Sequence, residues 1–208
     1  MVLCYATNNS PLPSHISTVN VSGPTMNPAM NNAALLYHPD GYRTDGKKLM
    51  GRQAAGESFL RGYLAYAEAE PIYAYCHSNR HYQDFKAFCE THYRGDKPLV
   101  AKGIVNHNIG LLSQVGGLFV PGPNIEDFGW RRLRFHKADF SLTGVTHTTA
   151  SEGAMAHLAK LVTAPLEAWD AVICTSSFVR KTVDRLIAGH ASYLSEHMGL
   201  DADWRPRV

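Results

Sequence analysis

The sequence predicts an α/β fold, in which helices cover both faces of a mostly parallel β-sheet. Apolar runs of about 4–8 residues, typical of buried strands, recur along the chain. Between them lie longer segments whose apolar residues recur at helical spacing. Strands that alternate with helices in this way form βαβ units, so a Rossmann-like sheet is expected.

Length and composition fit one globular unit. The chain has 208 residues, of which 45% are hydrophobic and 18% charged, enough for one domain with a sizeable core. Residues 1–32 are rich in Asn, Ser, Pro and Thr and lack a sustained period, so we expect an extended or loosely packed arm. The Rossmann-like domain is expected over residues 33–208.

Six strands are predicted from the apolar runs. They are AALLY (33–37), IYAYCH (72–77), PLVA (98–101), GGLFVPG (116–122), FSLTGVTH (140–147) and WDAVICT (169–175). Helices are expected from Gly51 to about Glu68, around Phe85, Phe88 and Cys89, over residues 125–135, and after each of the last two strands. The predicted buried faces are Ala55, Phe59, Tyr63 and Leu64; Met155, Leu158, Leu161 and Val162; and Val179, Val183, Leu186 and Ile187.

The net charge and the positions of the cysteines indicate which partners and which cellular compartment to expect. A net charge of +2 gives no argument for a nucleic-acid surface. The dense basic stretch Arg131, Arg132, Arg134, His136 and Lys137 is interpreted as a solvated helix face. The four cysteines are scattered, with no C-x-x-C pair, so buried reduced thiols and a cytoplasmic location are expected. The sequence contains neither a signal-peptide pattern nor an apolar run long enough for a transmembrane helix.

Ligands of parallel α/β sheets bind where the carboxyl ends of strands lead into helices. Three such loops carry polar residues, at 38–56, 143–151 and 175–178. The first runs into GRQAAGES (51–58), which differs by one residue from the phosphate-binding pattern G-x-x-x-x-G-K-[ST]. Glu57 stands at the lysine position and would repel a triphosphate, so we expect instead a glycine-rich turn that opens a helix.

The second loop holds His147 at the end of a predicted strand. Thr149 and Glu152 have capping-box spacing, which predicts a helix start at about Ala150. His147 would then point into the ligand cleft and donate a hydrogen bond to a substrate hydroxyl or an anionic oxygen. The alternative is a structural histidine bonded to a backbone carbonyl, and the sequence leaves both open.

Three other sequence patterns do not predict a metal site, a serine hydrolase site or a dinucleotide site. His77 and His81 are four residues apart, but no second ligand pair accompanies them, so no metal is expected. Ser176 or Ser177 is expected to cap a helix, and no G-x-S-x-G elbow surrounds them. The G-x-G-x-x-G fingerprint of dinucleotide sites is missing, so no cofactor is expected either.

Four stretches together resemble the amino-terminal, acceptor-side domain of bacterial GT-B glycosyltransferases of the family 4-like, retaining type. They are LMGRQAAGESFLRGY, GGLFVPGPNIEDFGWRR, SLTGVTHTTASEGAM and APLEAWDAVICTSSFVRKTV. The resemblance spans roughly residues 33–200 and is most specific from Ser141 to Val183.

The resemblance implies one half of a GT-B fold, with a hexosyltransferase-like activity that uses a nucleotide-sugar donor and a sugar or other hydroxyl acceptor. The donor-binding domain that follows in the family would be missing after Val208, so this chain alone would be inactive. It implies that His147 is catalytic, contacting the transferred sugar. The implied substrate-binding residues are Gly51, Arg52, Gly56, Thr146, Thr148 and Ser176.

Two other functions remain compatible with the sequence. One is a stand-alone module that binds a sugar or nucleotide without turning it over. The other is a nucleotide-sugar epimerase, although the missing dinucleotide fingerprint argues against it.

Overall fold

A computed structural model describes residues 32–45, 51–67, 71–96, 98–135 and 139–199. Its centre is one sheet of six parallel strands, which confirms the predicted α/β, Rossmann-like fold class. The strands are β1 (Ala34–Tyr37), β2 (Ile72–Cys76), β3 (Ala101–Val105), β4 (Gly117–Val120), β5 (Ser141–Thr146) and β6 (Ala171–Cys174). The predicted arm, apart from Asn32, lies outside the described residues.

The strand order places a topological switch point in the middle of the sheet. The order is β3-β2-β1-β4-β5-β6, so the chain runs outward from β1 on one side and outward from β4 on the other. Neighbouring loops at the carboxyl ends of β1 and β4 therefore leave the sheet in opposite directions. Sheets of this order bind ligands at that crevice.

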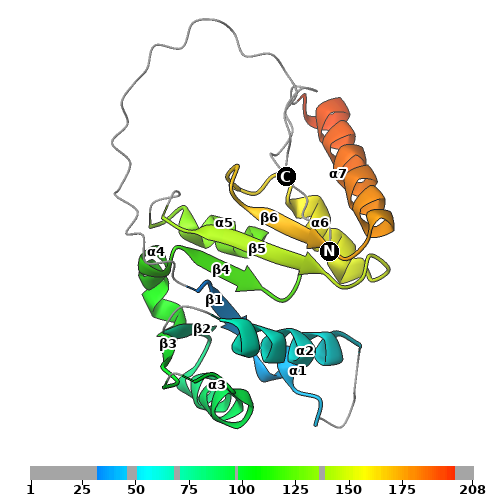
Figure 1. The fold of residues 1–208 in the computed structure, drawn as a ribbon. Coiled ribbons are helices and arrows are strands. Elements are labelled where there is room, and N and C mark those ends of the chain that lie inside the picture. The colour runs from blue at the N-terminus through cyan, green and yellow to red at the C-terminus, as the bar shows by residue number, and fades with distance from the viewer. Residues whose placement is uncertain (1–31, 46–50, 68–70, 97, 136–138, 200–208) are drawn as a thin grey trace, which may run out of the picture.

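Seven α-helices connect and cover the strands in the part of the chain that the structure describes. They are α1 (Pro39–Tyr42), α2 (Gly51–Tyr66), α3 (Asn79–His92), α4 (Leu112–Val115), α5 (Glu126–Arg132), α6 (Glu152–Lys160) and α7 (Ser177–Met198). A 3-10 helix (Asn106–Leu111) precedes α4. Figure 1 shows α1 and α2 on the near face of the sheet, with α5 and α6 on the far face.

Two apolar layers follow from the alternation of side chains along each strand. Leu118 of β4, Leu142 of β5 and Val172 of β6 point to the far layer, where they pack with residues of α5, α6 and α7. Phe119, Val145 and Ile173 lie an odd number of positions after these residues on the same strands and point to the near layer. The helical members of the near layer come from α1, α2 and α3, which lie beside β1, β2 and β4. Among the described residues, no helix therefore packs over the near face of β5 and β6.

The third predicted strand is placed wrongly. Residues 98–100 are irregular, and β3 begins at Ala101. Parallel pairing with β2, from Ile72 with Ala101 to Cys76 with Val105, determines the strand. Because β3 is an edge strand with Lys102 and Gly103 exposed, its sequence does not read as an apolar run.

The predicted helix from Gly51 to about Glu68 is confirmed by α2, which spans Gly51–Tyr66. The glycine-rich turn expected to open it is wrong, since residues 51–56 already form the first turns of this helix. The buried face of α2 is Gly56, Leu60 and Leu64, whereas Ala55 is exposed. Phe59, expected in the core, keeps 38% of its surface exposed. It lies beside the cavity described below.

The cap of α6 differs from the predicted capping box. Ser151, rather than Thr149, is the N-cap, and its hydroxyl accepts a hydrogen bond from the Ala154 amide at 3.3 Å. The helix starts at Glu152 instead of Ala150. Leu158, Leu161 and Val162 are buried as predicted, but Met155 is 42% exposed.

Arg132 corrects the interpretation of the basic stretch as a solvated face. Its guanidinium is fully buried and donates to both carboxylate oxygens of Asp170, at 2.7 and 2.5 Å. It also donates to the Phe140 carbonyl at 2.8 Å. Asp170 in turn accepts the Leu142 amide at 2.8 Å. The pair joins the end of α5 to the starts of β5 and β6; His136 and Lys137 lie outside the described residues.

Cys76, Cys89 and Cys174 are buried free thiols, as predicted, and Cys4 lies outside the described residues. Within the described ranges, no helix combines the length and apolarity that crossing a membrane requires.

Candidate ligand-binding site

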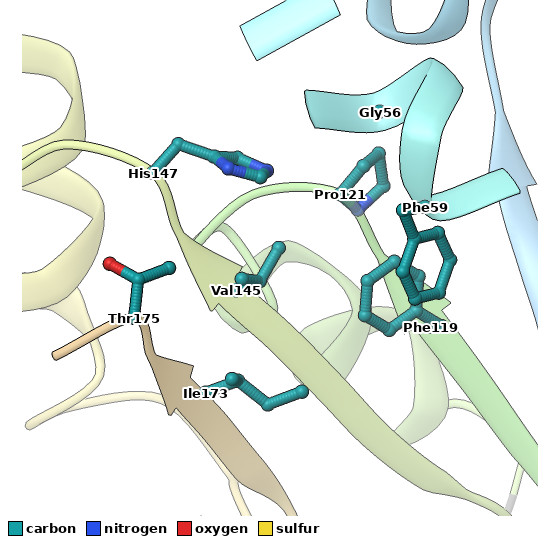
Figure 2. Close-up of a pocket in the computed structure, with 8 residues that line it drawn as sticks. All are labelled: Gly56, Phe59, Phe119, Pro121, Val145, His147, Ile173 and Thr175. Atoms are coloured by element: carbon teal, nitrogen blue, oxygen red, sulfur yellow. The ribbon is translucent and has the colours of Figure 1, made fainter. Parts of the chain in front are cut away.

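A cavity of about 280 Å³ opens at the carboxyl ends of β4, β5 and β6, beside α2. The residues that line it are Gly56, Phe59, Phe119, Pro121, Val145, His147, Ile173 and Thr175. Figure 2 shows these side chains around the ends of the strands. The cavity lies next to the β1–β4 switch point, on the near face that α2 covers only in part. This is where the topology predicts a ligand.

Gly56 brings α2 close to the sheet. A Cβ atom at this position would lie 2.0 Å from the carbonyl oxygen of Gly41 in α1, a distance that no side chain tolerates. The glycine therefore lets the backbones of α1 and α2 touch. The resemblance implied that Gly56 binds substrate. The structure gives a packing reason for this glycine, which also forms part of the cavity wall.

Two stacked aromatic rings form one wall. Phe59 of α2 and Phe119 of β4 have ring centroids 4.3 Å apart and an interplanar angle of 16°. Phe119 is nearly buried, whereas Phe59 remains partly exposed at the cavity. Figure 2 shows the two rings side by side, below the Gly56 turn of α2.

The loop after β4 closes the wall beside Pro121. The Val145 amide of β5 donates to the Gly122 carbonyl at 3.0 Å, which holds this loop against the strand. A Cβ atom at Gly144 would lie 2.7 Å from the same carbonyl oxygen. Glycine at 144 therefore allows the loop to cross the end of β5 and to place Pro121 opposite Val145.

His147 supplies a polar group to the wall. It follows β5 directly, and Figure 2 shows its ring projecting toward Pro121 and the Gly56 turn. The residue is exposed overall, but its side chain is partly removed from water where it lines the cavity. This desolvation lowers the pKa of the imidazole below its usual value. The neutral imidazole carries one donor and one acceptor nitrogen.

The remainder of the wall is apolar. Pro121, Val145 and Ile173 expose only carbon at the cavity, and none of the lining residues is a lysine, arginine or carboxylate. Figure 2 shows the methyl group of Thr175 on the side of Val145 and its hydroxyl on the opposite side. The arrangement holds an apolar group and offers it one hydrogen-bonding partner, His147.

Sequence reasoning found two of the eight lining residues, Gly56 and His147. The others lie in predicted strands or on the predicted core face of a helix, and Thr175 is also the first residue of the candidate loop 175–178. Two signals pointed to the cavity. The β4 and β6 runs end in Pro121 and Thr175, directly at the sheet edge, and Phe59 lies one position off the buried stripe of α2.

The remaining predicted site residues do not line the cavity. Gly51 and Arg52 are exposed in the first turn of α2. Thr146 is buried and donates to the Ile173 carbonyl at 3.0 Å. Thr148 accepts from the Ala150 amide at 3.1 Å. Ser176 is the N-cap of α7, as expected, and accepts from the Val179 amide at 3.2 Å.

Three histidines gather at the carboxyl ends of β1 and β2. The rings of His38 and His81 have centroids 4.4 Å apart, and His77 follows β2. Desolvation first, and then neighbouring cations and imidazoles, lower the pKa values of His77 and His81. In the described part of the chain, no group of three His, Cys, Asp or Glu residues has the geometry of a metal site.

Comparison with protein-family models, with curated proteins and with solved structures gives no match.

Proposed function

We propose that this chain is the acceptor-side half of a retaining glycosyltransferase, which moves a hexose from a nucleotide-sugar donor to a hydroxyl acceptor. The observation that supports it best is that Gly56 and His147 line one cavity. These residues belong to two of the stretches that carry the resemblance, and they are far apart in sequence. In a half of this type, the acceptor lies at the carboxyl edge of the sheet and the donor is held from across the cleft.

The site's composition agrees with that division. Transfer breaks the bond from the sugar's anomeric carbon to the nucleoside diphosphate and forms a bond from that carbon to the acceptor oxygen. The diphosphate leaves with the bonding electrons, and its departing oxygen takes up the proton that the acceptor hydroxyl loses. A leaving diphosphate requires cations or aligned donors, and none of the residues around the cavity is cationic at neutral pH. A second domain would have to provide the groups that bind the diphosphate.

His147 would contact the transferred sugar. Its neutral imidazole can donate one hydrogen bond to a ring hydroxyl while positive charge builds on the sugar ring. Because this bond is best aligned in the transition state, it would lower the barrier more than it strengthens ground-state binding.

Calorimetry with UDP-glucose and GDP-mannose tests the proposal. The acceptor-side half should bind either compound only weakly, with a Kd well above micromolar, and should not turn it over. A Kd near micromolar, about −8 kcal/mol, without turnover would favour the stand-alone binding module instead. The same Kd with hydrolysis or transfer would show that this half holds the donor by itself.

A further inference from the structure

We propose that the cavity beside Phe59, Phe119 and His147 holds an apolar ring of the acceptor, so that the acceptor is a hydroxyl compound with an aromatic or similarly apolar ring. This inference rests on the proposed acceptor role for its biological meaning, but the cavity's preference for an apolar ring can be tested by itself.

The size of the cavity fits a ring. At about 280 Å³ it is larger than the cavity of about 150 Å³ that holds benzene in an engineered protein. It is too small for a complete nucleotide sugar, since pockets for drug-sized ligands occupy about 300–1,000 Å³. One ring, or two fused rings, therefore fits inside while the remainder of the acceptor stays outside.

The chemistry of the wall selects an apolar group. Side chains of Phe59, Phe119 and Ile173 present carbon to the cavity, and the Thr175 hydroxyl lies on the side away from Val145. A sugar ring buried here would leave most of its hydroxyls without partners, at a cost of several kcal/mol per group on alkane scales. A nucleobase would lose its edge hydrogen bonds in the same way. An aromatic ring has no ring hydrogen bonds to water that it would lose here, and it can pack against the stacked phenyl groups.

The position of His147 orients such a ligand. His147 lines the cavity beside the apolar wall and is also exposed to solvent, so a hydroxyl attached to the bound ring can reach its imidazole. That places the acceptor oxygen at the edge of the sheet where the sugar would arrive. A phenol or naphthol has this arrangement of ring and hydroxyl.

Binding of small probes to this chain tests the inference. Phenol and 2-naphthol are compared with methyl α-D-glucopyranoside by calorimetry and by amide NMR. We expect 2-naphthol to bind at least about tenfold more tightly than phenol, because the second ring buries more apolar area. Methyl glucoside should bind at least tenfold more weakly than phenol.

Two threonine variants locate the bound probe. Thr175→Trp places a large side chain at the cavity wall and should weaken 2-naphthol binding at least tenfold. Thr163→Trp, an exposed position in the turn after α6, is the matched control and should leave the Kd unchanged. Circular dichroism confirms that each variant is folded.

Three results would overturn the inference: no 2-naphthol binding by the folded protein, equal binding of methyl glucoside, or a Thr175→Trp variant that binds 2-naphthol normally. Failure of the proposed function gives a different pattern. If 2-naphthol binds in the cavity and UDP-glucose also binds with a micromolar Kd, the cavity is an apolar binding site. The proposal that this chain is the acceptor-side half would then be wrong.

Discussion

Gly56 of α2 and Gly41 of α1 lie so close that a Cβ atom on Gly56 would approach the Gly41 carbonyl oxygen to 2.0 Å. This contact fixes α2 against the loop that follows β1. Because Phe59 is on the next turn of α2, the same contact positions the aromatic wall of the cavity.

Gly56→Ala should therefore destabilise the protein and move α2. The added methyl group meets backbone that cannot rotate away, so the free energy of unfolding should fall by about 1–3 kcal/mol, as in overpacked cores. Urea denaturation measures it. Gly62→Ala, on the same helix with no heavy atom within 4 Å of the added Cβ, is the control and should stabilise by up to about 1 kcal/mol. Equal effects of both substitutions would show that helix propensity alone matters at Gly56.

Loss of the buried ion pair between Arg132 and Asp170 should lower the free energy of unfolding more than loss of an exposed ion pair. Asp170→Ala leaves a buried guanidinium without its carboxylate and frees the Leu142 amide, so a loss of about 3–5 kcal/mol is expected. Asp184→Ala removes the exposed partner of Arg180 and should cost at most about 0.5 kcal/mol. Thermal or urea unfolding of the two variants gives the comparison. A small effect at Asp170 would mean that water replaces the carboxylate.

The layout of the sheet could be predicted because five of its strands are apolar runs, while β3 could not. Its residues Lys102 and Gly103 face solvent at the sheet edge, and only pairing with β2 determines where it starts. The burial of Arg132 could not be predicted either. Its place at the end of a helix resembles a surface position, and its partner Asp170 is brought near only by folding. Most of the cavity could not be predicted from the sequence. Phe119 and Val145 have the pattern of ordinary buried strand residues, and they line a cavity only because α2 covers the near face of the sheet in part.

The titration of His147 should follow from its partial desolvation. Its pKa lies below the usual value of about 6.5 in the folded state, so the unfolded chain binds more protons in the window just below that pH. The contribution of His147 to stability is thus present above about pH 6.5 and is lost as the pH falls through the folded pKa. The stability of the unchanged protein relative to His147→Ala should decrease on acidification from about pH 7.5 to about pH 5. Proton NMR gives the pKa directly, and a value above 6.5 would contradict this account.

Replacement of His147 should affect turnover more than stability in the two-domain enzyme that the proposal requires. Loss of one aligned donor lowers kcat by roughly 10²-fold or more. The melting temperature at neutral pH should change little, because the side chain lines the cavity but is exposed to solvent. If the variant melts much earlier and the folded fraction turns over normally, His147 is a structural turn residue.

An amide NMR titration of this chain with phenyl β-D-glucopyranoside, which joins an apolar ring to a sugar, tests directly whether the cavity is the acceptor site. The largest chemical-shift changes should fall on Gly56, Val145, His147 and Thr175, which line the cavity at the carboxyl edge. The amide signals of Gly116 and Ser141, at the amino ends of β4 and β5, should not move. Changes centred on His38, His77 and His81 or on the amino edge of the sheet, or an unchanged spectrum, would show that the acceptor does not bind in this cavity.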